Sequence, residues 1–222
     1  MMDTAFLAQT ALFKNVPPTE IEVRMHCLGG TVRSYQKGSY IHYAGDVVHT
    51  VSMVLSGKVI IENDDLWGNR NLLGQIGPGE LFAEAYACAE NEPLLINVLA
   101  AENTTVLMMD LSKVFHTCSR SCPQHQQISD NLLHILARKN LSLSRRILHT
   151  SSKSIRGRVL SYLSFLAAQQ KKKIITVPFN RQQMADYLSV DRSALSNELS
   201  KMQKEGILEY HKESFKLLKE EE

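Results

Sequence analysis

Residues 180–210 carry the pattern that most constrains the fold, two amphipathic helices separated by the short turn Ser189-Val190-Asp191. In each helix the apolar residues recur at intervals that place them on one face: Met184, Ala185 and Leu188 in the first, Leu195, Leu199 and Met202 in the second. Asp191 is a suitable N-cap for the second helix, and Gly206 is a suitable stop. The pattern predicts a helix-turn-helix, with an ordinary helical hairpin as the alternative.

The second helix begins with small or polar side chains that its apolar face does not use: Arg192, Ser193, Ser196 and Asn197. A helix of this kind can enter the major groove of DNA and offer hydrogen-bond donors to base edges. This segment alone therefore indicates DNA binding as a hypothesis.

Charge is unevenly distributed along the chain. Residues 1–150 contain 12 Lys and Arg against 14 Asp and Glu, whereas residues 151–219 contain 13 against 6, and the last three residues are all Glu. A basic block of this kind fits a polyanionic partner, which it would bind through phosphate contacts and counterion release. A solvated charged surface is the alternative explanation.

Residues 28–111 have the texture of a β domain, because short apolar runs alternate with glycine-containing turns. The candidate strands are residues 39–43, 51–55, 58–62, 71–76 and 104–109. This spacing predicts an all-β barrel or sandwich. A short helical lead-in over residues 1–22 precedes it, and we expect Pro17 and Pro18 to end that lead-in.

A helical period runs from Pro123 to about Ser151. Residues spaced by three and four form a heptad seam, namely Leu133, Leu136, Asn140, Leu143 and Ile147. We expect this seam to pair with a second copy of the chain, and Asn140 to fix its register at some cost in stability. A second apolar line, formed by Ile128, Leu132 and Ile135, could pack on the β domain. A helix buried within one chain is the alternative.

The residues after 151 predict further helical and strand elements. Ser154 is a suitable N-cap for a helix over residues 155–170, from which Arg156 and Arg158 should face outward. Lys171–Lys173 would end this helix, favourably placed against its dipole.

Residues 174–179 are a candidate strand, and Asn180 with Gln183 resembles a capping box at the start of the helix-turn-helix. Two further strand-like runs, residues 207–210 and 215–218, predict a hairpin. The C-terminal part is therefore predicted to be a winged helix.

Composition and motifs argue against several other classes of protein. No charge-free run approaches the length of a membrane span, and the N-terminus lacks the features of a signal peptide, so we expect a cytoplasmic protein without a membrane partner. The four cysteines are too few and too scattered for a disulfide scaffold. No nucleophile elbow, P-loop or zinc-protease motif occurs, so we expect no enzyme and assign no catalytic residue.

A glycine-punctuated β domain, a long helix and a winged helix-turn-helix, in this order, resemble the cyclic-AMP receptor protein/FNR (CRP/FNR) family of bacterial transcription regulators. The residues that carry the resemblance are YQKG at 35–38, AGD at 44–46, VLSGKV at 54–59, GPGELFAE at 77–84, NRQQMADYL at 180–188 and EGIL at 205–208. The resemblance covers nearly the whole chain and implies an α+β protein. Its expected parts are a β-roll sensor at 1–122 (cyclic-nucleotide-binding-like, a double-stranded β-helix), a dimerisation helix at 123–151 and a DNA-binding winged helix at 152–222.

The resemblance also implies a homodimer on a palindromic operator in double-stranded DNA, with RNA polymerase as a further partner and an effector that controls binding allosterically. Arg192, Ser193 and Asn197 match the family's base-reading positions, although the family often has Arg where Asn197 stands. Ser196 lies beside them. The candidates for phosphate contacts are Thr176, Arg181 and Lys201.

The sensor domain departs from the cyclic-nucleotide-binding members of the family. In those members a Gly-Glu pair meets the ribose and an Arg-Ser pair meets the cyclic phosphate, whereas this chain has Ala83-Glu84 and, near residues 93–95, no cation. Because a buried phosphate without a paired cation is costly, we do not expect cyclic AMP to be the effector. Glu84, Leu94 and Leu95 are candidates for an effector pocket, with structural or core roles as the alternative.

Four candidate metal or redox residues precede the long helix: His116, Cys118, Cys122 and His125. Zinc, haem iron or a redox pair are chemically possible there, and small packing residues are the alternative. We do not expect an N-terminal iron–sulfur cluster, because no cysteine precedes Cys27.

The sequence as a whole predicts a DNA-binding regulator that responds to an unknown small molecule or redox signal. The alternative is a cyclic-nucleotide-binding-like sensor or protein-interaction module without specific DNA binding.

Overall fold

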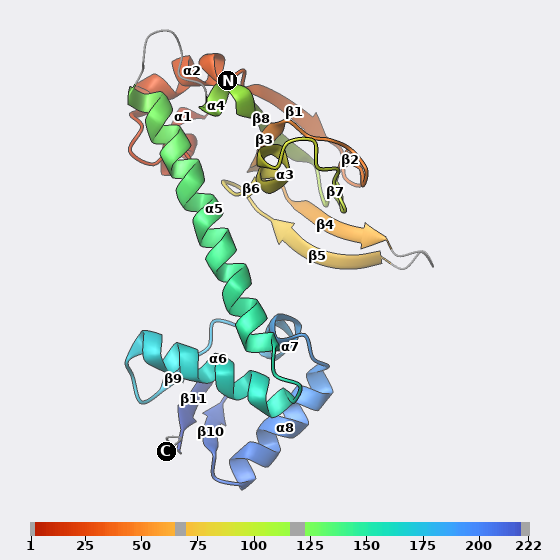
Figure 1. Cartoon of the computed structure of the whole chain (residues 1–222), viewed down its shortest axis with the longest axis vertical. Helices are drawn as coiled ribbons and strands as arrows, with labels where there is room; N and C mark the ends of the chain where they lie inside the picture. Colours follow the sequence, from red (N-terminus) through yellow and green to blue (C-terminus); the bar gives the residue numbers. More distant parts are fainter. Residues whose placement is uncertain (1–2, 65–69, 116–122, 219–222) are drawn as a thin grey trace. The chain divides into compact units, whose positions relative to one another are not determined.

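The computed structural model describes residues 3–64, 70–115 and 123–218 of the 222-residue chain (Figure 1). The chain divides into two compact units, Met1–Arg138 and Lys139–Glu222, and the long helix α5 (Pro123–Thr150) contributes residues to both. Each unit has its own hydrophobic core. No helix within these described ranges is both long enough and apolar enough to cross a membrane.

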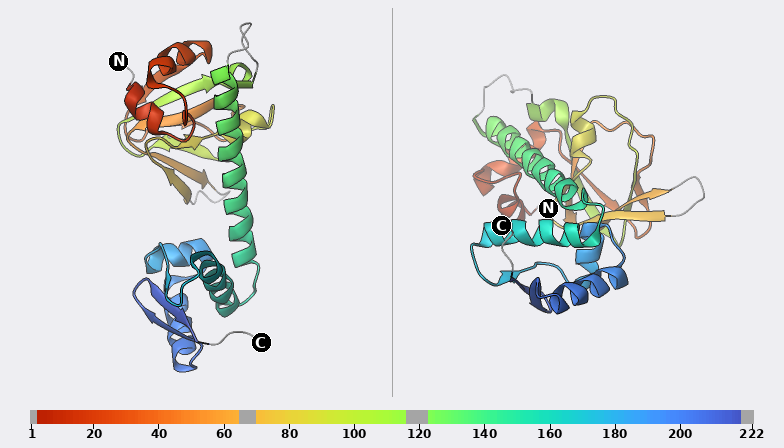
Figure 2. Two further views of the ribbon diagram at one scale, coloured as in Figure 1. Left: turned by 90° about the vertical axis from the view of Figure 1, so that its left-hand side faces the viewer. Right: turned by 60° about the horizontal axis from the view of Figure 1, so that its bottom comes forward.

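The described part of the first unit contains two four-stranded antiparallel sheets (Figure 2). One sheet has the order β1 (Thr31–Tyr35), β8 (Thr104–Asp110), β3 (Thr50–Ser56), β6 (Leu81–Phe82), and the other has the order β2 (Tyr40–His42), β7 (Asn97–Ala100), β4 (Val59–Asp64), β5 (Arg70–Ile76). All five predicted strands are confirmed. Strands β1, β6 and β7 were not predicted; β6 has only two residues, too few for an alternating pattern to be read.

Apolar side chains from both sheets pack against one another. Val54, Phe82, Val106 and Met108 come from the first sheet, and Val59 and Val98 come from the second. These residues form one buried cluster, so the two sheets face each other across it. The packed sheets confirm the predicted β-roll and, with the helices, the α+β class.

Among the described residues, four short helices flank the sheets: α1 (Thr4–Gln9), α2 (Pro18–Cys27), α3 (Glu84–Cys88) and α4 (Leu111–Phe115). The prediction that Pro17 and Pro18 end a helical lead-in is wrong, because α1 ends at Gln9 and Pro18 is the first residue of α2. Proline suits this position, since the first helical turn does not use its missing N–H and its fixed φ matches the helix.

The first half of α5 packs on the core of the first unit. Ile128 and Leu132 are fully buried in that core, and Ile135 is partly buried against it, which confirms the predicted second apolar line. Leu136, which we assigned to the dimer seam, also packs against this core. Leu136 lies one helical turn after Leu132 and so near the same side of the helix, and its place in the dimer seam stays a prediction.

The second unit is a winged helix. After the end of α5 it contains α6 (Ile155–Gln170), β9 (Ile175–Thr176), α7 (Arg181–Leu188), α8 (Arg192–Lys204), β10 (Leu208–His211) and β11 (Ser214–Leu217), with the sheet order β10-β11-β9. The predicted helices and hairpin are confirmed, and the Ser154 hydroxyl caps α6 by accepting a hydrogen bond from the Gly157 N–H at 3.0 Å. The predicted strand at 174–179 is too long, because only Ile175 and Thr176 pair with β11 and Pro178 has no N–H for a ladder.

Gly57, in the turn between β3 and β4, provides a test of the β-roll. Its φ is +81°, and an added Cβ would lie 2.5 Å from the Asn103 carbonyl oxygen. Gly38 has nearly the same φ, +82°, but an added Cβ there would meet nothing within 4 Å. Both Gly→Ala changes should cost about 1–3 kcal/mol of unfolding free energy from backbone strain, and Gly57→Ala should cost clearly more because of the overlap.

Thermal and urea unfolding of the full chain would measure this difference. Equal destabilisation by Gly57→Ala and Gly38→Ala would show that the close approach at Gly57 is not a constraint on the fold.

Candidate nucleic-acid interface

The helix-turn-helix is held by side-chain caps at the starts of both helices. The Asn180 side chain accepts from the Gln183 N–H at 2.9 Å and the Gln183 side chain accepts from the Asn180 N–H at 2.9 Å, which confirms the predicted capping box. Asp191 caps α8 by accepting from the Ala194 N–H at 2.9 Å. The hydrogen bond from the Ser193 hydroxyl lowers the pKa of Asp191 most, and hydrogen bonds from backbone N–H groups lower it further. This cap therefore stays ionised at neutral pH and is lost only as the pH falls through the lowered pKa.

The apolar faces of the two helices form the core that the sequence predicts. Their six residues are at most 1% exposed: Met184, Ala185, Leu188, Leu195, Leu199 and Met202. The other face of α8 is therefore left for solvent or for a ligand.

The four candidate base-reading residues fall into two groups. Ser193 donates to Asp191, and Ser196 donates to the Arg192 carbonyl at 3.0 Å, so both hydroxyls are already used in hydrogen bonds at the start of α8. The side chains of Arg192 and Asn197 are exposed and form no hydrogen bond or ion pair with the part of the chain that the structure describes. Arg192 and Asn197 are therefore the side chains best placed to bind something outside the protein.

The candidate phosphate contacts also differ from one another. Thr176 and Lys201 are exposed, whereas Arg181 is partly buried. The Arg181 guanidinium lies 5.1 Å from the centre of the Tyr210 ring and 5.5 Å from that of Phe215, and burial lowers its pKa. These cation–π contacts tie the start of α7 to the wing formed by β10 and β11.

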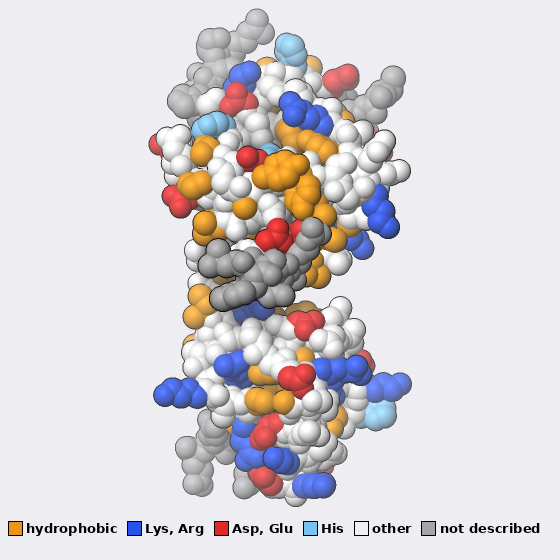
Figure 3. Space-filling model, turned by 90° about the vertical axis from the view of Figure 1, so that its right-hand side faces the viewer, with side chains coloured by type: hydrophobic (Ala, Val, Ile, Leu, Met, Phe, Trp, Pro, Cys, Tyr) orange, Lys and Arg blue, Asp and Glu red, His pale blue; other side chains and the backbone are white. Residues whose placement is uncertain are grey.

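Two exposed lysines near this surface were missed by the sequence analysis. Lys212 lies in the turn of the wing with φ +52°, and Lys204 shares the exposed face of α8 with Asn197. The signal for Lys212 was its place between the two predicted strands of the hairpin. Lys and Arg side chains are spread over the visible surface of this unit (Figure 3).

Arg146 and Arg158 bind the carbonyl groups at the end of α7. Arg146, from α5, donates to the carbonyls of Asp186 at 3.0 Å and Tyr187 at 3.2 Å. Arg158, from α6, donates to the carbonyls of Leu188 at 3.1 Å and Ser189 at 2.9 Å. Since the last carbonyls of a helix lack partners within it, the two arginines supply donors where the helix itself cannot.

Arg158 also donates to the Ser152 carbonyl at 2.8 Å, so it joins the α5–α6 connection to the turn of the helix-turn-helix. Arg156 donates to Glu198 at 2.7 Å and to both carboxylate oxygens of Glu205, and these partners raise its pKa. The prediction that Arg156 and Arg158 simply face outward is therefore wrong. Long-range partners, which periodicity does not encode, turn both side chains toward the helix-turn-helix.

His149, in the last turn of α5, is completely buried. Its Nδ1 lies 3.2 Å from the Ser161 hydroxyl, and its ring is surrounded by Tyr162, Phe165 and Tyr187 at centroid distances of 5.5, 5.1 and 6.1 Å. Burial, followed by the charge of Arg145, lowers the pKa of His149. The imidazole is therefore neutral at physiological pH, and its packing contributes stability that decreases as the pH falls below the unfolded-state pKa.

The candidate effector residues differ in their exposure to solvent. Glu84 begins α3 and is 5% exposed, Leu94 is 1% exposed, and Leu95 is 66% exposed. Leu94 therefore belongs to the interior, while Leu95 faces outward. Burial and the charge of Glu84 raise the pKa of the nearby Cys88 thiol.

The candidate metal residues His116, Cys118 and Cys122 lie outside the described residues, as does the side chain of His125. Elsewhere in the chain, no three His, Cys, Asp or Glu side chains of the described residues are grouped so that they could hold a metal ion.

The remaining seam residues form an exposed apolar face along α5. Leu133, Leu143 and Ile147 are 63%, 62% and 69% exposed, and Asn140 is exposed between them. Leu141 and Leu148, at 53% and 62% exposure, extend this face on one side. The heptad pattern did not predict Leu141 and Leu148, because it selects only a narrow stripe of residues along the helix. The apolar surface that α5 leaves exposed is wider than that stripe.

Two family models match this chain. Residues 32–121 match the cyclic nucleotide-binding domain, and residues 157–222 match the Crp-like helix-turn-helix domain. The chain belongs to the CRP/FNR family of transcription regulators. The cyclic AMP receptor protein of Thermus thermophilus is 26% identical over 197 residues, which cover 89% of this chain and 87% of that protein.

Two solved structures share the fold of this CRP/FNR-family chain. The Thermus thermophilus catabolite activator protein has a TM-score of 0.51 at 22% identity, covering 94% of this chain and 93% of that one. CprK complexed with OCPA has a TM-score of 0.56 at 18% identity, covering 89% and 91%. The resemblance seen in the sequence is thus confirmed at the level of family and fold.

Removing the Arg158 side chain tests whether its hydrogen bonds hold the end of α7 in place. Arg158→Ala should lower the free energy of unfolding by about 2–3 kcal/mol, because charge-assisted hydrogen bonds to several carbonyls are lost. Arg158→Lys should recover only part of this, since an ammonium cannot reproduce the planar fork of donors. Denaturant unfolding, with amide hydrogen exchange at residues 186–189, would measure both effects.

The matched control is Lys153→Ala, which removes an exposed cation from the same connection. If Arg158→Ala were no more destabilising than this control, the contacts with the α7 carbonyls would not hold the helix-turn-helix.

Proposed function

We propose that this CRP/FNR-type regulator acts as a homodimer that reads a palindromic operator with Arg192 and Asn197, under the control of an effector other than cyclic AMP. The observation that carries the proposal is that these two side chains are exposed and form no hydrogen bond or ion pair with the described residues. They lie on a helix whose opposite face is fully buried. Arg192 would pair with guanine O6 and N7, and Asn197 with adenine N6 and N7. Ser193 and Ser196 would contribute less, because their hydroxyls already serve α8.

Phosphate contacts would position α8 in the groove without specifying sequence. Lys201 and Thr176 are exposed and suited to this role, and Lys212 in the wing is a further candidate. Arg181 would act chiefly by holding the wing, since its guanidinium already stacks on Tyr210 and Phe215. The excess of 13 basic over 6 acidic residues in 151–219 supports electrostatic binding to DNA.

The exposed face of α5 supports the homodimer. Its leucine and isoleucine side chains would be costly to leave in water, and a second copy of the same helix would cover them. Asn140 lies within this face, where a polar pair would favour one register. Two copies joined here would present two α8 helices, which suits half-sites one helical turn of DNA apart, about 34–36 Å.

The sensor unit supports an effector without a cyclic phosphate. From Asn71 to Ser112 the sequence has no Lys or Arg, and the segment at 93–95 offers a buried Leu94 and an exposed Leu95 in place of a cation. Of the relatives named above, one is called a cyclic AMP receptor protein, and another, CprK, is complexed with OCPA. Glu84 remains a predicted pocket residue, the 116–125 segment a predicted redox or metal site, and RNA polymerase an expected partner.

Arg192→Ala tests base reading on the protein's own operator, once that sequence has been selected. It should cost about 1–3 kcal/mol at a single base position and leave non-specific binding nearly unchanged. Lys201→Ala is the contrasting variant, because loss of a phosphate contact should weaken binding to all sequences and reduce the salt slope by about 1. Fluorescence anisotropy titrations at several salt concentrations would separate the two.

Uniform weakening by Arg192→Ala would remove it from base reading. If the wild-type protein showed no preference for any sequence, the alternative of a sensor module without specific DNA binding would be favoured.

Leu143→Lys tests the dimer. Leu143 contacts neither core, so the folded chain should tolerate the change, whereas the dimer would have to bury two ammonium groups in place of two leucines. The dimer dissociation constant should rise by about a hundredfold or more. Sedimentation velocity over a concentration series would measure this.

Ser142→Lys, an exposed position of α5 outside the apolar face, is the matched control and should leave assembly unchanged. Equal behaviour of the two variants would place the dimer interface elsewhere.

A further inference from the structure

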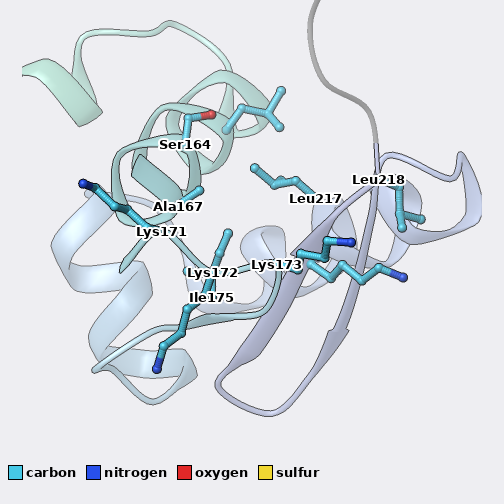
Figure 4. A pocket seen from close by; sticks show the side chains of 10 residues that line it. Ser164, Ala167, Lys171, Lys172, Lys173, Ile175, Leu217 and Leu218 are labelled. Carbon is cyan, nitrogen blue, oxygen red and sulfur yellow. The ribbon is translucent and has the colours of Figure 1, made fainter. Parts of the chain in front are cut away.

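The second unit, Lys139–Glu222, which we call the DNA-binding unit, contains a hollow that the proposed function does not use. It has a volume of about 830 Å³ and lies between α6, the turn after α6, and strands β9 and β11 (Figure 4). Neither Arg192 nor Asn197 lines it. The hollow is therefore separate from the surface proposed to read bases.

The wall of the hollow is apolar. Leu160 and Ala167 contribute from α6, Ile175 from β9, and Leu217 from β11. Ile175 is buried, and the other three are partly buried, so a ligand in the hollow would remove further apolar surface from water. The volume lies in the range of about 300–1,000 Å³ that is typical of small-molecule sites.

The rim of the hollow is cationic. Lys171, Lys172 and Lys173 come from the turn after α6, and Lys216 comes from β11. Lys216 is paired with Glu209 at 3.2 Å, whereas the three consecutive lysines form no ion pair with the described residues. No carboxylate is among the lining residues that the structure describes, and the labelled lysines spread around the hollow rather than meeting at one point (Figure 4).

A simpler role would account for part of this pattern. Lysines after a helix interact favourably with its C-terminal dipole, and Lys171 is the C-cap of α6. The dipole does not account for Lys216, which is on a different element, or for the apolar hollow that the four lysines surround.

We propose that this hollow binds an amphipathic anion, a ligand with one carboxylate or similar group and an apolar body of medium size. The apolar part would lie on Leu160, Ile175 and Leu217, and the anionic group would reach Lys172 or Lys173 at the rim. A purely inorganic anion would leave the apolar wall in water, and an uncharged hydrocarbon would leave the lysines without a partner. Nucleic acid is the other polyanion that lysines bind, but its backbone would not use the apolar wall.

Titration calorimetry of the full-length protein with decanoate tests the proposal, with decanol and inorganic phosphate as comparison ligands. We expect decanoate to bind with a stoichiometry of one per chain and both comparison ligands to bind much more weakly. Lys173→Gln should weaken decanoate binding by roughly fivefold, as expected for one charge near a solvated anion, and Lys172→Gln/Lys173→Gln by more than about tenfold. Ser164→Trp, at an exposed position of α6 that lines the hollow, should block binding by filling it.

Lys153→Gln is the matched control, because it removes one exposed cation from the same unit outside the hollow. Chemical shifts of methyl-labelled Ile175 and Leu217 should change on addition of decanoate and report the location independently of affinity. Absence of decanoate binding, or equal binding by the Lys173→Gln and Lys153→Gln proteins, would overturn the proposal. The same would follow if Lys173→Gln weakened binding to non-specific duplex DNA while leaving decanoate binding intact.

Discussion

The hydrogen bonds from Arg146 and Arg158 to the last carbonyls of α7 are the polar contacts that join three helices of the DNA-binding unit, α5, α6 and α7. They come from two different helices, α5 and α6, and meet at Asp186–Ser189, where α7 ends and the turn toward α8 begins. His149 packs as a neutral ring among aromatic side chains. A helix that reads bases must be held to within a fraction of a hydrogen-bond length, and these contacts fix the helix that precedes it.

The same contacts would give the proposed effector signal a physical route within the DNA-binding unit. The end of α5 is bound directly to the end of α7, so a change in how α5 ends would be felt at the turn of the helix-turn-helix. In the proposed homodimer, α5 is also the element that pairs the two chains. Any rearrangement of the exposed face of α5 would therefore change the distance between the two α8 helices. That distance must match the separation of the two half-sites in an operator.

Features of the fold that depend on neighbouring residues were readable from the sequence. The capping box of Asn180 and Gln183, the Asp191 cap and the buried face of α8 all follow from spacing over three or four residues, and all are confirmed. Features that depend on distant partners were not readable. Arg158 finds its acceptors 30 and 31 residues away, Arg156 is paired with Glu198 and Glu205, and Arg181 stacks on the wing. Leu136 lies at the border of two faces of α5, so periodicity alone did not show that it packs against the core of the first unit.

In the proposed function, two copies of α8 read two copies of one half-site. Selection of bound sequences from a random DNA library by the full-length protein tests it most directly, with and without the low-molecular-weight fraction of the source cells to supply an effector. We expect enrichment of an inverted repeat whose half-sites lie about 10 base pairs apart, centre to centre. Enrichment of a single unpaired site, or of no sequence in either condition, would contradict it.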